Sequence, residues 1–274
     1  MSEDRKGRRL ALSPARKMVM EVLHHAQQVP TLPLSKVVRV HALASARSSG
    51  AFVSWTALFM KAYGIVGQRN PELRRAYIRF PWPHLYEHPI SECGLLVERE
   101  HEGENIVLGA KIRAPELHTL AQLDGFLRHF RETPVMEIGN YRQWLRTGRM
   151  LAPMRRLIVW TSLHLSGWKR CKRFGTFAIS SLGSLGVEQH HPLALQTTYL
   201  TFGPIAANGE VTAKIIYDHR VMDGRTVARC LCDLEEVLNT SVLDELTAMI
   251  PLKPETAKKD LAPLALATGR RVPK

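Results

Sequence analysis

YDHRVMDG, residues 217 to 224, joins a stretch patterned like a strand to one patterned like a helix. The residues before it alternate as one face of a strand does: Val211, Ala213, Ile215 and Tyr217. The residues after it recur at the spacing of an amphipathic helix: Val227, Leu231, Leu234 and Leu238. The sequence therefore predicts a strand that delivers His219 to a turn, and a helix that opens at Asp223 and Gly224.

A histidine at the end of a strand is held by a rigid element and can still reach a cleft. Its ordinary pKa lies near neutrality, which suits proton removal from a hydroxyl or thiol. A structural interpretation stands beside this one. In it, Asp223 is only the N-cap of the following helix, and His219 is a turn histidine whose hydrogen bonds are satisfied.

Helical and strand-like stretches are mixed along the rest of the chain, which predicts a single α/β domain. Ser13-Pro14 is typical of a helix start, and Asn70-Pro71 of a helix end. We expect a hairpin around Glu102-Gly103-Glu104. The predicted helices lie at 14–29, 55–69 and 117–130, and the predicted strands at 34–40, 93–99, 105–112, 175–182, 196–203 and 211–217.

Four motifs resemble the catalytic domain of dihydrolipoamide acyltransferases, and the last is also similar to the H-x-x-x-D-G of chloramphenicol acetyltransferases. In chain order they are LSPARK (12–17), SWTALFMKA followed by NPEL (54–62, 70–73), GTFAISSLG (175–183) and DHRVMDG (218–224). They follow the family's order and span roughly residues 8 to 245. The resemblance implies the CoA-dependent acyltransferase fold, a chloramphenicol acetyltransferase-like two-layer α/β sandwich with a mixed sheet.

The resemblance also implies a reaction and roles for three residues. An acyl group passes from a thioester to a hydroxyl, amine or thiol acceptor. His219 corresponds to the general base, Ser180 to the hydroxyl that stabilises the oxyanion, and Asp223 to the carboxylate that keeps the turn in shape. Acyl-CoA, or an acyl carrier or lipoyl thioester, is the expected cosubstrate, with no permanently bound cofactor and no metal. Without the resemblance, Ser180 is more simply interpreted as an ordinary strand serine.

Members of the family are typically trimers with the active site between subunits. The resemblance therefore implies a homotrimer or a multiple of three, in which His219 of one subunit meets Ser180 of its neighbour. The alternative from another class is a non-catalytic trimeric scaffold that descends from such an enzyme and binds a partner through its basic surface.

The chain also departs from the family's pattern. We expect a freestanding catalytic domain over 10–248 without a lipoyl domain, a basic lead-in over 1–9 and a C-terminal arm over 249–274. Residues 141–173 form an apolar stretch with basic ends that the family lacks. Three interpretations of that insertion remain open: a core helix with a solvated basic end, an interfacial membrane helix, or a hydrophobic substrate site with a basic entrance.

The composition of the chain favours some classes of binding partner over others. The formal net charge of +13 favours anionic groups such as CoA phosphates or an anionic membrane face. Nucleic acid is disfavoured, because the basic residues are not interleaved with aromatic residues. The four cysteines form no C-x-x-C pair, which is typical of free thiols in a reducing compartment. We expect a cytoplasmic protein, with peripheral membrane contact as a further hypothesis.

Overall fold

The computed structural model describes residues 7–50 and 52–250. Its centre is a six-stranded sheet with the order β1-β8-β7-β6-β4-β5. The strands β6 and β7 are parallel to each other, β6 is also parallel to β4, and the other neighbours are antiparallel. The bounds are β1 Thr31–Arg39, β4 Glu92–His101, β5 Glu104–Arg113, β6 Phe177–Ser180, β7 Thr198–Phe202 and β8 Glu210–Asp218. The predicted α/β fold with a mixed sheet is confirmed.

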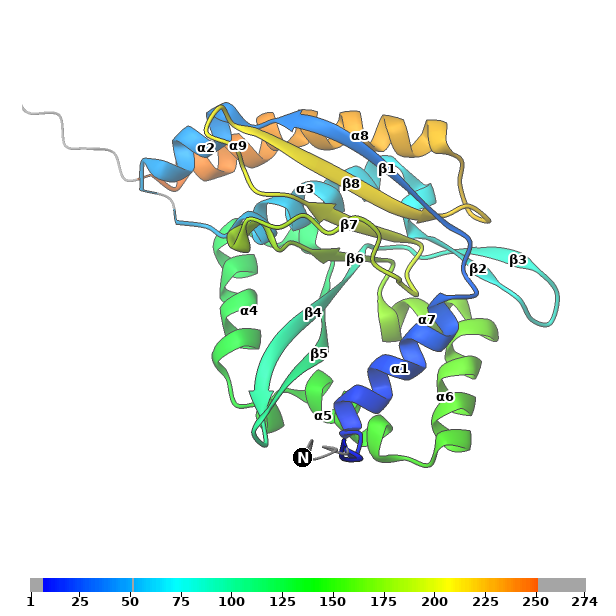
Figure 1. The fold of residues 1–274 in the computed structure, drawn as a ribbon. Helices are drawn as coiled ribbons and strands as arrows, with labels where there is room; N and C mark the ends of the chain where they lie inside the picture. Colours follow the sequence, from blue (N-terminus) through cyan, green and yellow to red (C-terminus); the bar gives the residue numbers. More distant parts are fainter. Residues whose placement is uncertain (1–6, 51, 251–274) are drawn as a thin grey trace, which may run out of the picture.

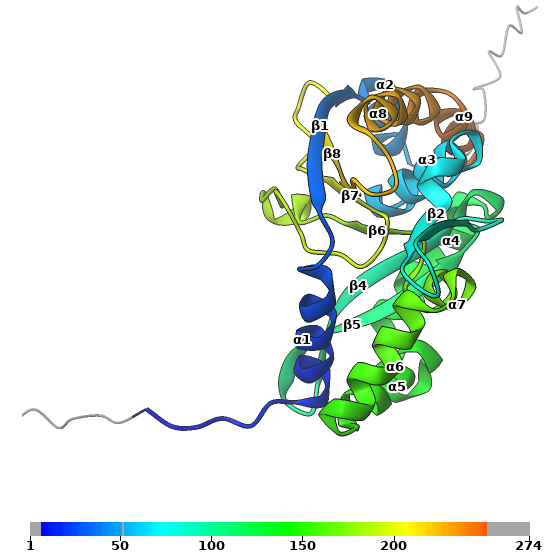
Figure 2. The same ribbon diagram turned by 90° about the vertical axis from the view of Figure 1, so that its right-hand side faces the viewer.

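Helices gather at both ends of this sheet (Figures 1 and 2). Around β1 and β8 lie α2 (His41–Ser48), α3 (Trp55–Arg69), α8 (Gly224–Asn239) and α9 (Ser241–Ala248). Around β4 and β5 lie α1 (Pro14–Ala26), α4 (Leu120–Glu132), α5 (Gly139–Arg149), α6 (Ala152–His164) and α7 (Gly167–Phe174). A second, two-stranded sheet pairs β2 (Arg75–Ile78) with β3 (His84–Glu87).

The two faces of the large sheet have different environments. One face carries Leu95, Ile179, Leu200 and Ile215, which join the main hydrophobic core with residues of α3, α4 and α8. The opposite face carries Ala178, Tyr199 and Ile216, which form a small cluster of their own. Because side chains alternate along a strand, Ser180 lies on this second face, two residues beyond Ala178 on β6.

Local sequence signals place most of the elements where the structure has them. Ser13 accepts a hydrogen bond from the backbone N–H of Arg16 (3.2 Å) and so caps α1. The turn of the β4–β5 hairpin has positive φ at Glu102 and Gly103, as a tight connection requires. The predicted helix from 117 begins only at Leu120, because Leu117 ends a 3₁₀ turn and is exposed. The helices α2 and α9 and the β2–β3 hairpin were not predicted.

The insertion predicted at 141–173 is occupied by three helices, α5, α6 and α7. The inner face of α6 packs Val159 and Leu163 into a second hydrophobic cluster with α1 and α7. Its outer face leaves Met154 and Leu157 exposed. The core interpretation therefore holds for one face of α6 and for Tyr141 and Leu145 of α5, which join the main hydrophobic core. Within residues 7–50 and 52–250, no helix is long and apolar enough to cross a bilayer.

Candidate functional site

The turn after β8 holds His219 through its own backbone and through neighbouring strands. The N–H of His219 donates to the carbonyl of Pro30 (3.0 Å), just before β1. The N–H of Asp218 donates to the carbonyl of Thr197 (2.9 Å), and that of Val221 donates back to the carbonyl of Asp218 (3.0 Å). These bonds fix the direction in which the His219 side chain leaves the sheet.

A buried ion pair reinforces the turn. The carboxylate of Asp218 is fully buried, and it accepts bonds from Nε (2.9 Å) and Nη2 (2.7 Å) of Arg220. It also accepts the backbone N–H of Arg220 (3.0 Å). The guanidinium lies 4.5 Å from the centre of the Tyr77 ring. Sequence reasoning missed this pair, although its two residues flank His219 in the motif that it singled out.

The ring of His219 is oriented for base catalysis. Its Nδ1 lies 3.1 Å from the backbone carbonyl of Met222. Since a carbonyl oxygen only accepts, Nδ1 carries the proton and Nε2 is left with its lone pair. The side chain is 45% exposed, so Nε2 is open to an incoming group. This one contact thus selects the tautomer in which Nε2 can accept a proton.

Asp223 stands at the N-cap position of α8 without capping it. Its side chain makes no hydrogen bond to the first turn of the helix, is 85% exposed, and has Oδ1 3.5 Å from Nδ1 of His219. The cap interpretation is therefore wrong for the Asp223 side chain. The carboxylate therefore lies beside the His219 ring.

Ser180 ends β6 at the edge of an open groove of about 680 Å³. Its hydroxyl donates to Oε1 of Gln189 (3.3 Å), in the segment that crosses the second face of the sheet. A hydroxyl held by a replaceable side-chain partner can turn toward a substrate oxygen. Gln189 was missed by sequence reasoning, because nothing local marks it as a neighbour of Ser180.

The turn after Ser180 is built for close backbone approach. The hydroxyl of Ser181 donates to the carbonyl of Phe202 (2.9 Å) and accepts the N–H of Gly183 (3.1 Å). A Cβ on Gly183 would stand 2.8 Å from the carbonyl oxygen of Gly203. Only glycine fits there without moving the β7 end, so the turn holds the groove's edge in place.

Ser180 and His219 of one chain lie at opposite ends of the sheet. Ser180 pairs with Thr201 on β7, and Thr201 pairs with Lys214 on β8. From Lys214, the middle of β8, the chain runs through the second half of that strand before it reaches His219. At about 3.3 Å per residue this separates the two side chains by on the order of 15 Å or more. The structure therefore does not bring the two predicted residues together within a single chain.

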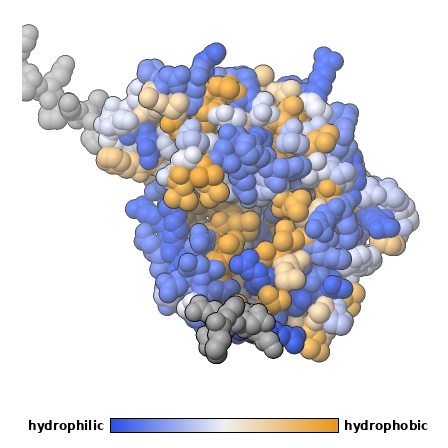
Figure 3. Space-filling view, viewed as in Figure 1, coloured by the Kyte–Doolittle hydropathy of each residue, from blue (hydrophilic) through white to orange (hydrophobic). Residues whose placement is uncertain are grey.

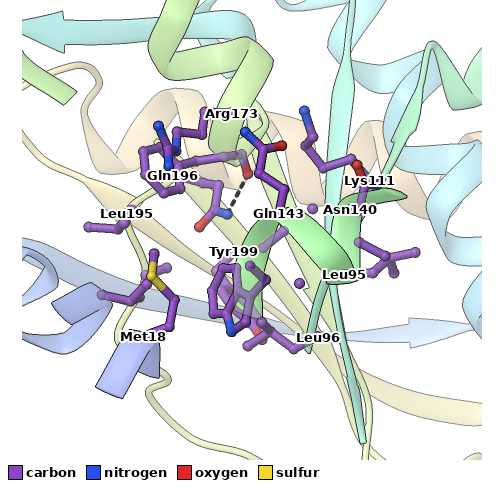
Figure 4. Close-up of a pocket in the computed structure, with 18 of the residues that line it drawn as sticks. Met18, Leu95, Leu96, Lys111, Asn140, Gln143, Arg173, Leu195, Gln196 and Tyr199 are labelled. Atoms are coloured by element: carbon purple, nitrogen blue, oxygen red, sulfur yellow. Dashed lines mark hydrogen bonds between the residues drawn. The ribbon is translucent and has the colours of Figure 1, made fainter. Parts of the chain in front are cut away.

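An apolar pocket of about 90 Å³ lies on the same face of the sheet as Ser180 (Figure 4). It is lined by residues of α1, α5, α7, β4 to β7 and the segment before β7, among them Met18, Leu96, Trp144, Phe174, Ala178, Leu193 and Tyr199. Figure 3 shows apolar surface in the hollow between α1 and the β4–β5 hairpin. Lys111 and Arg173 also line the pocket, so the apolar space has cationic neighbours.

Buried thiols are poor candidates for a nucleophile. Burial raises the pKa of the Cys171 thiol to about 12 and that of Cys230 to about 12, and it raises the pKa of Cys93 as well. Among the described residues, no group of three or more His, Cys, Asp and Glu side chains is arranged to hold a metal ion. The four cysteines are free thiols, and on α8 Cys230 is buried whereas Cys232 is exposed.

Comparison with solved structures identifies the fold. The cubic core of the pyruvate dehydrogenase multienzyme complex matches with a TM-score of 0.61 at 16% identity, covering 88% of this chain and 96% of that one. The dihydrolipoamide acetyltransferase of Azotobacter vinelandii matches with 0.61 at 16%, covering 87% and 94%. A truncated catalytic core of the 2-oxoacid dehydrogenase complex from Thermoplasma acidophilum matches with 0.60 at 15%, covering 85% and 99%.

No protein-family model matches the sequence, and no curated protein does. At these low identities, the structural matches show the fold and leave the chemistry to be argued from the residues. The chain has the fold of dihydrolipoamide acyltransferase catalytic cores over nearly its whole described length, as the motifs in its sequence predict.

Proposed function

We propose that this protein is an acyltransferase that uses His219 as its general base. The observation that carries the proposal is the hydrogen bond from Nδ1 of His219 to the Met222 carbonyl. It leaves an exposed, unprotonated Nε2 at the end of a central strand, on an acyltransferase fold. In the Azotobacter enzyme, the catalytic roles of a serine, a histidine and an asparagine have been investigated, and the asparagine follows the histidine by four residues. Asp223 follows His219 at the same interval.

The reaction proceeds by direct attack without an acyl-enzyme. Nε2 of His219 removes the proton of the acceptor hydroxyl, amine or thiol as the acceptor attacks the thioester carbonyl. Ser180 turns from Gln189 and donates its hydroxyl hydrogen to the developing oxyanion. The tetrahedral intermediate then expels the donor thiolate, which takes the proton back from the imidazolium. The carboxylate of Asp223 stabilises that cation while it exists.

A site that contains both residues requires two chains. The separation of Ser180 and His219 across the sheet supports a homotrimer, or a multiple of three, in which each site takes His219 from one subunit and Ser180 from the next. The groove beside Ser180 would then become one wall of a substrate channel. The positive net charge favours a phosphate-bearing donor such as acyl-CoA. A thioester of an acyl carrier or of a lipoyl group would react in the same way as acyl-CoA, because the acyl carbonyl is bonded to sulfur in each.

The apolar pocket supports a hydrophobic acyl chain. Ala178, which lines it, precedes Ser180 by two residues on the same face of β6, so a chain whose carbonyl meets Ser180 can extend into the pocket. Gly109 makes room for its wall: a Cβ there would stand 2.9 Å from the Trp144 ring. Two of the three helices of the 141–173 segment, α5 and α7, contribute to this lining.

Activity should therefore rise with acyl-chain length and fall when the pocket is closed. Leu193→Trp places a large ring in the lining and should lower kcat/KM for a long-chain acyl-CoA roughly 10-fold or more, since each buried methylene contributes about 0.8 kcal/mol. Turnover of acetyl-CoA should change little. The rate of thiol release, measured with acyl-CoA thioesters of increasing chain length, gives both the long-chain kcat/KM and the acetyl-CoA turnover. Leu185→Trp, at an exposed position in the turn after β6, is the matched control. A preference for acetyl-CoA that Leu193→Trp leaves unchanged would exclude a chain-binding role for the pocket.

The outer face of α6 supports a weak contact with anionic membranes. Its exposed apolar residues continue into Leu165 and Trp168, and Lys172 stacks on the Trp168 ring at 4.4 Å. Apolar side chains beside cations are the pattern of an interfacial segment. Sedimentation with phosphatidylserine vesicles should show binding at roughly 0.05 M salt that is lost near 0.5 M. Leu157→Asp should abolish it and Leu117→Asp should not. If the Leu157→Asp and Leu117→Asp variants bind the vesicles equally well, the outer face of α6 is not the membrane contact.

A further inference from the structure

A second cavity, of about 150 Å³, lies on the inner side of the His219 turn. It is enclosed by α1, the end of β2, α6, α7 and the turn itself. Its lining is dominated by cationic and ring nitrogen groups: His25, Arg79, His164, Arg170 and Arg220, with Gln28, Val29, Tyr77, Leu163 and Leu195 completing it. The volume holds several water molecules, and therefore also a small anion.

In the part of the chain that the structure describes, two of the three guanidinium groups make no direct ion pair with a carboxylate. Arg220 is paired with Asp218 by two direct bonds. Arg170 is only 4% exposed, and its bonds go to the backbone carbonyls of Tyr77 (3.2 Å) and Leu195 (2.7 Å). Among the described residues, no carboxylate lies within 4.0 Å of Arg170 or Arg79. Arg170 is therefore a buried cation whose direct partners are neutral carbonyls, which is a costly arrangement, whereas Arg79 is exposed to solvent.

The two histidines add unused hydrogen-bonding groups. His25 is 6% exposed, and its Nε2 lies 3.6 Å from Oε1 of the buried Glu21; Nδ1 of His25 and Nδ1 of His164 have no hydrogen-bond partner in the described structure. Burial lowers the pKa of His25, and burial together with Arg170 lowers that of His164 to about 4. Buried polar groups are normally satisfied, so orphaned nitrogens around a polar cavity point to a missing ligand.

We propose that this cavity binds a phosphate group or an equivalent tetrahedral oxyanion. Such an anion would lie beside the guanidinium groups of Arg79 and Arg170, and its oxygens can accept from the ring N–H groups of His25 and His164. Because Arg220 reaches the cavity from the residue next to His219, the anion would also brace the turn that holds the base. The inference concerns the charge of the cavity and stands independently of the acyl-transfer reaction.

Calorimetric titration of the full chain with sulfate tests the site, because sulfate stays a dianion from pH 6 to 8. We expect saturable binding at constant ionic strength that sodium chloride does not reproduce. Arg79→Gln, an exposed position at the cavity, should weaken sulfate binding roughly 10-fold. Arg128→Gln removes the same charge from α4, away from the cavity, and should have no effect. The proposal is wrong if wild-type protein shows no saturable sulfate binding, or if the two variants behave alike.

A pH series separates this site from a general attraction to a basic surface. The groups that face His25 are Glu21, His24 and Arg156, and those that face His164 are Arg170, His25, Arg79 and Arg220. A bound dianion favours the protonated rings, so binding takes up protons and affinity should fall as the pH rises from 6 to 8. His164→Gln should flatten this dependence. Affinity that is independent of pH in wild-type protein would overturn the histidines' role as ligands.

Competition with bound sulfate distinguishes two sources of the phosphate group, the free ion and a cosubstrate. Inorganic phosphate should displace sulfate from the wild-type protein. If CoA also displaces sulfate and Arg79→Gln weakens that competition, the site receives a cosubstrate phosphate; if only inorganic phosphate competes, the site takes the free ion. Failure of both phosphate compounds to displace bound sulfate would contradict a phosphate site.

Discussion

Replacing His219 by Ala is expected to lower acyl transfer at least 100-fold while the protein stays folded. General acid–base catalysis contributes typically 10²- to 10⁴-fold, and the imidazole of His219 follows directly on the last residue of β8. The side chain is 45% exposed and makes only two polar contacts, to Met222 and Asp223, so its removal disturbs few interactions of the fold. Thiol release from an acyl-CoA, with thermal unfolding measured in parallel, provides the check.

The matched control is His129→Ala. His129 is an exposed histidine on α4 whose ring bonds only the neighbouring Thr133 hydroxyl (2.8 Å), and its loss should leave turnover unchanged. If His219→Ala retains near-wild-type turnover, general-base catalysis by His219 is excluded. If wild-type protein transfers no acyl group from any thioester, the fold serves instead as the non-catalytic scaffold that the sequence also allows.

The sequence predicts best the elements that carry their own boundary signals. Ser13-Pro14 caps α1, Asn70-Pro71 ends α3, and the alternation over 211–217 is that of a strand with one face in the core. In each case the residues that decide the outcome are neighbours along the chain. The same holds for the His219 turn, where strand, base and helix start lie within one short motif.

Prediction fails where the partner lies far away in sequence. α1 buries Met18, Glu21 and His25, because Arg155 of α6 pairs with Glu21 (3.1 Å). Hydrophobic spacing favours Leu23 for that face, yet Leu23 is exposed. The hydrogen bond from Ser180 to Gln189 and the cationic cavity were missed for the same reason. They join segments that only the folded chain brings together, so no local pattern marks them.

The membrane hypothesis for residues 141–173 shows a second reason why the sequence alone does not predict the structure fully. The stretch is apolar at Leu157, Ile158 and Val159, but apolar character does not say which residues face inward. In the structure Val159 is buried and Leu157 is exposed on the opposite side of α6. A segment of this composition therefore contributes to the core and to the surface at once. Only the packing of α6 against α1 decides which residue does which.

Replacing Ser180 by Ala is expected to lower kcat roughly 100-fold with little change in the donor KM. A hydroxyl that meets the oxyanion acts mainly in the transition state, so its loss should appear in kcat. Ser180 lies partly exposed at the edge of the groove and its hydroxyl donates to the side chain of Gln189, which makes the truncation mild for the fold. Steady-state kinetics of thiol release measures the two constants. A loss confined to KM would assign Ser180 to donor binding instead.

The same variant tests whether the site is shared between chains. His219→Ala and Ser180→Ala subunits should each form trimers by light scattering and each be nearly inactive. A mixed trimer of the two should recover activity, because one of its three interfaces joins an intact His219 to an intact Ser180 of the next subunit. Mixing His219→Ala with His219→Ala,Ser180→Ala subunits should recover none. Because on the order of 15 Å of sheet separates the two residues within a chain, a mixture that stays inactive while forming mixed trimers would remove Ser180 from the catalytic site.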